Sequence, residues 1–125
     1  MLARPGALVR KVIGCAIEVH RALGPGLLES TYQVCFGQEL TYQNVAFRRE
    51  VPVPVVYRGV ALDCAYRVDF LIEGVLVVEV KSTNGLLPVH TSQVLTYLRL
   101  LNVHQGLLLN FNVPVLTKGM RNILR

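Results

Sequence analysis

A segment at positions 75–81, Val-Leu-Val-Val-Glu-Val-Lys, leaves few folds open to this chain. A strand this apolar is typical of the middle of a sheet, where other layers cover both of its faces. Its two charged residues, Glu79 and Lys81, would then lie in buried surroundings and need partners. Because Glu79 interrupts the run, no window offers the roughly 20 uncharged apolar residues of a membrane-spanning helix. The segment therefore predicts a sheet with helices on it.

The rest of the sequence supplies those helices and further strands. Apolar periodicity predicts helices over residues 7–23, 27–43 and 89–101, and strands over 51–55, 62–70, 75–81 and 105–111. Pro52 and Pro54 remove N–H groups from one side of their strand, which makes it an edge strand. The second helix is expected to bury Leu28, Tyr32, Cys35, Phe36 and Leu40, although Gly37 within it costs about 1 kcal/mol relative to alanine. This order of elements predicts an α/β fold, a mixed sheet with helices packed on it.

Composition narrows the class of protein further. The 125 residues amount to one domain, 1–125, and a hydrophobic content of 52% excludes disorder. Arg10 and Lys11 stand where a secretory signal needs apolar residues, which predicts a cytoplasmic protein with no membrane segment. Cys15, Cys35 and Cys64 have no CxxC spacing and are expected to be buried free thiols. The net charge of +5 permits a nucleic acid partner, but a solvated basic surface is the commoner cause of such a value.

The register of the hairpin between the second and third strands decides where their charges lie. A two-residue loop, Glu73-Gly74, would place Glu79 and Lys81 on the apolar face of the preceding strand. A three-residue loop that includes Val75 instead places Asp69 directly opposite Glu79, and Gly74 can adopt the left-handed conformation of such loops. The sequence therefore predicts two carboxylates with Cβ atoms about 5 Å apart.

Asp69 with Glu79-x-Lys81 is the arrangement that a magnesium site needs. It offers hard oxygen ligands on rigid strands, an ammonium group beside them, and open positions for water and phosphate. The plainer interpretation is a mixed acidic and basic patch on a solvated strand face. The apolar neighbours Val78 and Val80 weigh against it, because buried charges need partners.

These residues belong to a longer set of motifs that covers nearly the whole chain in order. The signature segment is Gly26-Leu27-Leu28-Glu29-Ser30-Thr31-Tyr32, preceded by Ala16 to Pro25, and the others are Leu62 to Asp69, Val78 to Lys81, Leu86 to His90, Gln93 to Leu98 and Leu107 to Phe111. In these stretches the chain resembles the PD-(D/E)XK nuclease superfamily and, within it, the small GxxExxY proteins.

The resemblance implies a restriction-endonuclease-like αβββαβ core in a single domain. It implies Asp69, Glu79 and Lys81 as the catalytic motif, Glu29 as an acidic residue delivered by a helix, and Gln93 as a polar residue on the following helix. Two of these also have plainer interpretations. Glu29 in a first helical turn complements the helix dipole, and Gln93 can be a solvated helix residue.

The expected activity is hydrolysis of phosphodiester bonds in nucleic acid, DNA or RNA, with Mg²⁺ as the cofactor and Mn²⁺ as its substitute. The expected metal ligands are Asp69, Glu79, the backbone carbonyl of Val80, and Glu29 through water or a second ion. Lys81 would position and acidify the attacking water, and Gln93 would orient that water or Lys81.

The alternative is a non-catalytic module, either a nucleic-acid-binding subunit or a homo-oligomeric accessory protein, which the high apolar content also favours. The basic residues that could follow a phosphate backbone are Arg48, Arg49, Arg67, Lys118, Arg121 and Arg125. A generic solvated surface is the preferred interpretation of Arg121 and Arg125. His20 and His90 have no partner at metal-ligand spacing and are expected at most to line the site.

Overall fold

Two helices, then five strands, then a helix and further strands follow one another along the part of the chain that the computed structural model describes, residues 6–63 and 65–125. The first half forms α1 (Ala7–Leu23), α2 (Glu29–Tyr42), β1 (Phe47–Pro52), β2 (Val55–Tyr57), β3 (Val60–Leu62) and β4 (Arg67–Ile72). The second half forms β5 (Leu76–Lys81), α3 (Pro88–Leu101), β6 (Gln105–Asn110), the short 3-10 helix η1 (Leu116–Gly119) and β7 (Met120–Leu124). All three predicted helices are confirmed. None of the described helices is long and apolar enough to cross a membrane.

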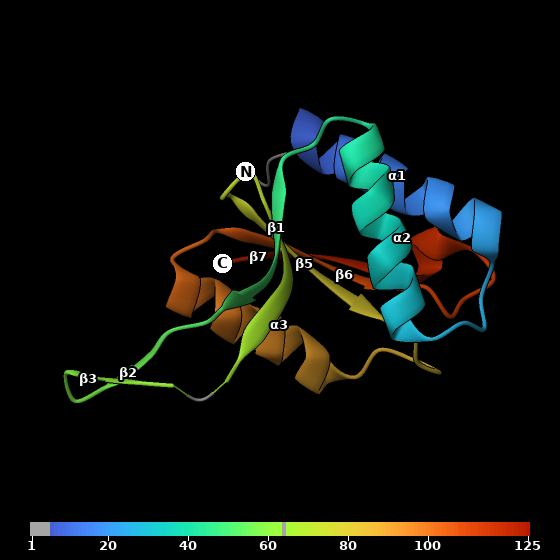
Figure 1. Cartoon of the computed structure of the whole chain (residues 1–125). Helices are drawn as coiled ribbons and strands as arrows, with labels where there is room; N and C mark the ends of the chain where they lie inside the picture. The colour runs from blue at the N-terminus through green and yellow to red at the C-terminus, as the bar shows by residue number, and fades with distance from the viewer. Residues whose placement is uncertain (1–5, 64) are drawn as a thin grey trace.

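Strand β5 lies in the middle of a five-stranded mixed sheet with the order β1-β4-β5-β6-β7 (Figure 1). It pairs antiparallel with β4 and parallel with β6, and α3 is the crossover between the two parallel strands. The outer pairs, β1 with β4 and β6 with β7, are antiparallel. The predicted central strand and the predicted α/β class are therefore confirmed, in a single domain consistent with a restriction-endonuclease-like fold.

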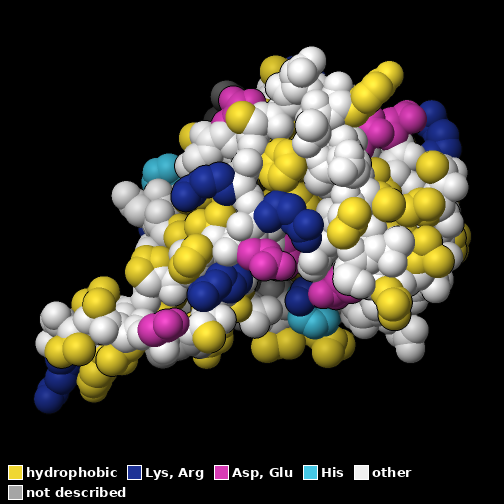
Figure 2. Space-filling view, in the orientation of Figure 1, with side chains coloured by type: hydrophobic (Ala, Val, Ile, Leu, Met, Phe, Trp, Pro, Cys, Tyr) yellow, Lys and Arg dark blue, Asp and Glu magenta, His cyan; other side chains and the backbone are white. Residues whose placement is uncertain are grey.

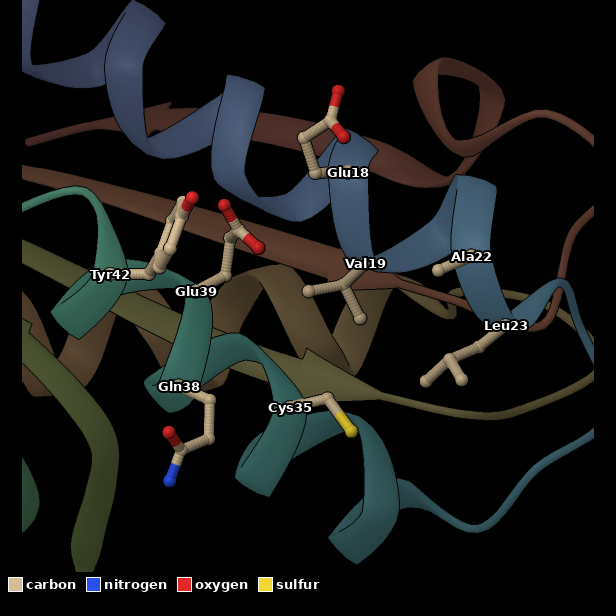
Figure 3. Close-up of a pocket in the computed structure, with 8 residues that line it drawn as sticks. All are labelled: Glu18, Val19, Ala22, Leu23, Cys35, Gln38, Glu39 and Tyr42. Atoms are coloured by element: carbon tan, nitrogen blue, oxygen red, sulfur yellow. The ribbon is translucent and has the colours of Figure 1, made fainter.

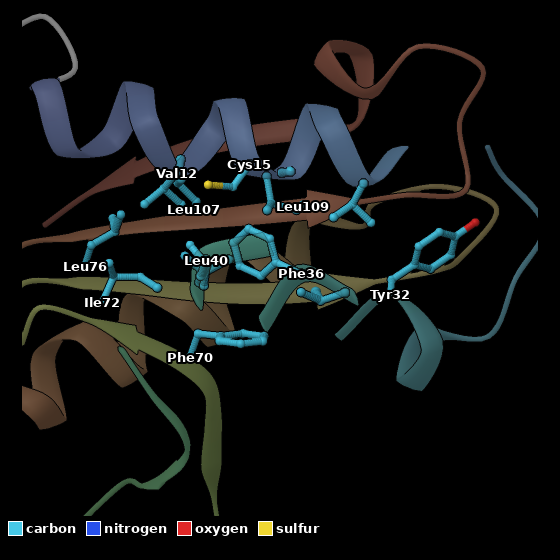
Figure 4. Close-up of a cluster of buried hydrophobic side chains, with 14 of the residues drawn as sticks. Val12, Cys15, Tyr32, Phe36, Leu40, Phe70, Ile72, Leu76, Leu107 and Leu109 are labelled. Carbon is cyan, nitrogen blue, oxygen red and sulfur yellow. The ribbon is translucent and has the colours of Figure 1, made fainter. Parts of the chain in front are cut away.

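Apolar side chains cover both faces of the sheet. One cluster joins α1 and α2 to alternate residues of the strands, among them Phe70, Ile72 and Leu76 (Figure 4). The other joins α3 to the intervening residues, among them Leu71 and Val77. The helices thus form a layer on each side of the sheet, which explains why β5 carries so few polar residues.

The β4–β5 hairpin has the register that the three-residue loop predicts. Phe70 pairs with Val78 and Ile72 pairs with Leu76. Glu73 and Gly74 both take positive φ values, 49° and 72°, and the N–H of Val75 donates to the carbonyl of Ile72 at 3.0 Å. The two charged residues of β5 therefore stay off the face that packs against α1 and α2.

The segment between β1 and β4 differs from the prediction. The edge strand is confirmed, but it ends at Pro52, and β2 and β3 form a separate hairpin, Val55–Leu62, that extends away from the body of the protein (Figure 1). We call this hairpin the arm. Its turn uses positive φ at Arg58 (51°) and Gly59 (79°), and the arginine gives little sign of such a turn in the sequence.

The single strand predicted over residues 62–70 is therefore wrong. Ala65 takes a left-handed φ of 59°, and its N–H donates to the side-chain oxygen of Asp63 at 3.0 Å. This local turn ends β3 before β4 begins at Arg67.

Two further details differ at the helices and cysteines. The second helix begins at Glu29, so Leu28 precedes it in extended backbone and is 75% exposed, not buried. Cys15 is a buried free thiol as expected, while Cys35 is free but only half-buried. Cys64 lies outside the described residues.

Strand β7 was not predicted at all. It runs antiparallel to β6 and forms the second edge of the sheet. Of its residues, only Ile123 is buried, so the segment lacks a readable apolar period.

Candidate active site

Asp69 and Glu79 lie at the point where β4 and β5 stop pairing as a regular ladder. Backbone pairing of the two strands covers Phe70–Ile72 with Leu76–Val78. Just beyond it, the carboxylate of Asp69 accepts the backbone N–H of Val80 through Oδ2 at 2.8 Å. The side chain thus binds backbone of the neighbouring strand, which fixes the Asp69 carboxylate beside Glu79. We call these two residues the carboxylate pair.

Glu79 is the electrostatic anomaly of the described structure. Its side chain is only 6% exposed, and its Oε1 atom is buried with no hydrogen-bond partner among the described residues. Burial, and after it the hydrogen bond and the charge of Asp69, together raise the pKa of this carboxyl group from 4.5 to about 9, although Lys81 lowers it in part. Near neutral pH the group must therefore hold a proton, unless a cation at the carboxylate pair takes the proton's place.

Lys81 ends β5, and a buried amide fixes the chain that follows it. The carbonyl of Lys81 accepts the N–H of Phe111 at 2.9 Å. Asn110, 1% exposed, donates to the carbonyl of Thr83 at 3.0 Å and accepts the N–H of Thr83 at 3.1 Å. Asn110 was given no role from the sequence, although a polar residue closing an apolar strand was a signal. It holds the β5 end in place for Lys81.

On α3, Gln93 and Tyr97 lie one helical turn apart. Gln93 is exposed, and both residues line the same hollow. Burial raises the pKa of Tyr97, and the charges of Glu79, Tyr66 and Asp69 raise it further. The phenol of Tyr97 therefore lies close enough to the carboxylate pair to feel both charges. The sequence did not single out Tyr97 or Tyr66, because only the packing of α3 on the sheet brings them here.

Glu29 begins α2, and the Gly26–Tyr32 segment fixes where that helix starts. The Tyr32 hydroxyl donates to the carbonyl of Gly24 at 2.5 Å and accepts the N–H of Leu27 at 3.2 Å. Ser82, directly after β5, donates to the carbonyl of Leu27 at 2.6 Å. These bonds bring the start of α2 to the end of β5, as Figure 1 also shows.

Even so, the structure does not gather Glu29 with the carboxylate pair. Among residues 6–63 and 65–125, no three His, Cys, Asp or Glu side chains form a group that could hold a metal ion. Glu29 is fully exposed at the helix start, where its charge also complements the helix dipole.

The two histidines of the matching stretches have structural contacts. His20 is buried and its Nε2 lies 2.8 Å from the carbonyl oxygen of Val113. His90 accepts the N–H of Leu87 through Nδ1 at 2.9 Å, which caps α3. Both contacts are ones that the fold itself needs.

Arg121 corrects the expectation of a generic solvated surface. It donates to Thr91 Oγ1 at 2.8 Å and to the carbonyls of Leu86 and Leu87 at 3.0 and 3.4 Å. The residue therefore ties β7 to the start of α3. Arg125 likewise donates to Asn102 Oδ1 at 3.0 Å.

Other arginines remain exposed. Arg67 precedes Asp69 on β4, and Arg49 lies on the α2 side of the sheet, with its guanidinium carbon 5.1 Å from the centre of the Phe70 ring. Figure 2 shows basic and acidic side chains gathered at the middle of the face that it draws, while the arm is mainly hydrophobic. Arg67 thus offers positive charge two residues before Asp69 in the chain.

A groove elsewhere on the surface is a weaker candidate. It lies between α1 and α2, encloses about 360 Å³, and is lined by Glu18, Val19, Ala22, Leu23, Cys35, Gln38, Glu39 and Tyr42 (Figure 3). Its lining is apolar apart from two carboxylates and an amide. The carboxylate pair with Lys81 offers more chemistry.

Comparison with known proteins agrees with the geometry. A family model described as the PD-(D/E)XK nuclease superfamily matches residues 6–123. No curated protein and no solved structure matches the chain. The family match covers both helical layers and every strand of the sheet. The chain therefore belongs to the PD-(D/E)XK nuclease superfamily.

Proposed function

We propose that this protein hydrolyses phosphodiester bonds of nucleic acid with the help of a divalent cation, Mg²⁺ or Mn²⁺. The observation that carries the proposal is the buried, unpartnered Oε1 of Glu79 beside the Asp69 carboxylate. Two acidic groups this close favour a cation, because one positive ion relieves both the repulsion and the missing contact. Hard oxygen donors suit magnesium and manganese.

The residues that would hold the ion are Asp69, Glu79 and the backbone carbonyl of Val80. Glu29 would contribute through water or a second ion, since it starts α2 near the end of β5. When bound, the ion would lower the pKa of a water molecule and polarise the phosphate oxygens.

Two side chains act on the reacting groups in this proposal, Lys81 and Gln93. The Lys81 ammonium group holds the attacking water and offsets negative charge that develops on the phosphate. Gln93 orients that water or Lys81 from α3. Exposed basic side chains could bind the phosphate backbone of the nucleic acid: Arg48, Arg49, Arg67 and Lys118.

We also assign the chain to the GxxExxY proteins within the superfamily and expect it in the cytoplasm. The role of Tyr32 supports the first assignment, because the hydroxyl fixes the loop that delivers Glu29. DNA and RNA both remain substrates to be tested.

A nicking assay tests the function. Supercoiled plasmid, single-stranded DNA and RNA would each be incubated with and without Mg²⁺ or Mn²⁺. Cleavage that needs the ion and disappears in Asp69→Asn supports the proposal. Glu18→Gln, a carboxylate removed from exposed α1, is the matched control and should cleave as the wild type does.

Binding of nucleic acid without cleavage under every metal condition would instead favour the non-catalytic module. Sedimentation of the same samples would show whether that module is a homo-oligomer.

A further inference from the structure

A second hollow lies between α3 and the base of the arm. It encloses about 320 Å³ and is lined by Val55, Tyr66, Gln93, Thr96, Tyr97 and Leu100. Val55 begins the arm, and Tyr66 lies just before β4. The arm, which the sequence did not predict, therefore supplies one wall of this hollow.

Two tyrosines, Tyr66 and Tyr97, form the aromatic part of the hollow's lining. Their ring centres are 6.1 Å apart with planes inclined by 50°. Tyr97 is 8% exposed and belongs to the core, whereas Tyr66 is 48% exposed and offers aromatic surface to a ligand. Leu100 and Val55 add apolar walls, and Gln93 adds an amide that can both donate and accept hydrogen bonds.

The hollow shares residues with the proposed active site. Gln93, which the proposed mechanism uses, and Tyr97, whose pKa is raised by burial and by the charges of Glu79 and Asp69, both line it. Arg67 directly follows Tyr66 and is exposed. A flat ligand in the hollow would thus lie against Tyr97, which feels the charges of Glu79 and Asp69.

We propose that this hollow binds one unpaired nucleobase, that of a nucleotide next to the phosphate to be cleaved. The proposal rests on the proposed nuclease function. An exposed tyrosine face with apolar walls is suited to base stacking, and the Gln93 amide is suited to the polar edge of a base. A paired base cannot enter, because it is stacked and its edge is occupied. The substrate class is therefore single-stranded nucleic acid, or a duplex end or junction with unpaired nucleotides.

Binding without metal tests the pocket separately from catalysis. Fluorescence anisotropy with a labelled single-stranded oligonucleotide, in EDTA, would compare the wild type with Tyr66→Ala and Tyr66→Phe. Tyr66→Ala should weaken binding about tenfold or more, and Tyr66→Phe should bind as the wild type does, since it keeps the ring. Tyr42→Ala is the matched control, because Tyr42 is an 83% exposed tyrosine on α2 and should leave binding unchanged.

A second variant keeps the proposal testable if Tyr66→Ala does not fold. Thr96→Phe fills the hollow from a helix surface and should weaken single-strand binding, while affinity for a blunt duplex stays within about twofold of wild type.

If both Tyr66→Ala and Thr96→Phe bind the single strand as tightly as the wild type does, the hollow does not bind a base. The same holds if a variant loses affinity for the single strand and the duplex equally. Because the binding runs without metal, a wild type that never cleaves leaves this result standing and counts only against the nuclease function.

Discussion

At the scale of single residues, Glu79 carries the strongest sign of a binding site. An acid that is buried, next to another carboxylate and without a partner for Oε1 costs stability in its ionised form. An apolar side chain in the same position of β5 would fit the surrounding core without that cost. The acid is therefore understandable as part of a binding site rather than as part of the packing.

The raised pKa of Glu79 predicts a pH dependence of stability. Between its ordinary value of 4.5 and about 9, the native carboxyl group keeps a proton that the unfolded chain has released. The free energy of unfolding should therefore fall as pH rises across that window, by at most about 1.4 kcal/mol per pH unit from this group.

Urea unfolding at several pH values measures this slope. Glu79→Gln keeps the shape and should flatten the curve, and saturating Mg²⁺ should flatten it for the wild type as well, since the ion replaces the proton. A wild-type slope that persists unchanged in Glu79→Gln would assign the dependence to another group.

Lys81 gives a sharper test of catalysis at the residue scale. Lys81→Met keeps the aliphatic stem and removes the ammonium group, so folding should survive. Binding should weaken only slightly because it is spread over several basic residues. The rate of cleavage should fall on the order of a hundredfold or more. This is the usual loss when one fixed group that stabilises the negative charge developing in the transition state is removed.

Lys81→Arg should also cleave poorly, since a planar guanidinium cannot replace a point charge beside one water. Lys11→Met, at an exposed lysine of α1, is the control for a lost ammonium. If Lys81→Met cleaves as fast as the wild type, the active site lies elsewhere.

Some residues of the site could be predicted from nearby sequence, and others could not because their contacts are distant in the chain. The register of the hairpin from Phe70 to Val78 could be predicted from the sequence, because alternation within two neighbouring strands fixes it, and Asp69 and Glu79 lie just beyond its last pair. Asn110 and Tyr66 could not be assigned a role, because their contacts join segments far apart in the chain. Arg121 was assigned to the solvent for the same reason.

At the scale of elements, the sequence predicted the long helices and the central strand from their apolar periodicity, and it missed the short strands whose positions depend on turns. The three helices and the central strand follow from apolar spacing over long segments. The arm depends on positive φ at Arg58, Gly59 and Ala65, and only one of these three positions is a glycine. β7 is an edge strand with one buried residue, and its pairing with β6 is visible only in the assembled sheet.

Two glycines in different elements predict opposite effects of the same substitution. A Cβ at Gly37 in α2 would lie 3.6 Å from the nearest atom of Phe70, which is an ordinary contact. A Cβ at Gly106 in β6 would lie 2.9 Å from Val94 Cγ1, beneath α3, so that packing would have to shift. Gly37→Ala should stabilise the protein by about 0.5–1 kcal/mol through helix propensity, whereas Gly106→Ala should destabilise it.

Urea denaturation of the two variants measures both effects. Each variant is the other's control, because both add one methyl group to a buried backbone position. Destabilisation by Gly37→Ala would mean that α2 packs more tightly on Phe70 than described here.

At the scale of the whole molecule, the site exists only when distant segments meet. β4 supplies Asp69, β5 supplies Glu79 and Lys81, and α3 supplies Gln93. Tyr32 and Ser82 add the start of α2 to the same end of the sheet. The unfolded chain has no such arrangement, so a cation that binds the site binds the native state.

That linkage predicts a thermal shift. Mg²⁺ or Mn²⁺ at about 100 times its dissociation constant should stabilise the native protein by about 2.7 kcal/mol and raise Tm measurably. Asp69→Asn should erase most of the rise, because it removes one charge of the pair. Its amide oxygen can still accept the Val80 N–H, so the variant should fold.

Glu18→Gln is the control for the loss of a carboxylate, since Glu18 pairs with Arg21 on exposed α1, and it should keep the full shift. An equal rise in Tm for wild type and Asp69→Asn would place the ion at another position. If the ion raises the Tm of the wild type but of neither Asp69→Asn nor Glu79→Gln, both carboxylates bind it. Neither residue alone offers enough charge to hold a hydrated divalent cation there.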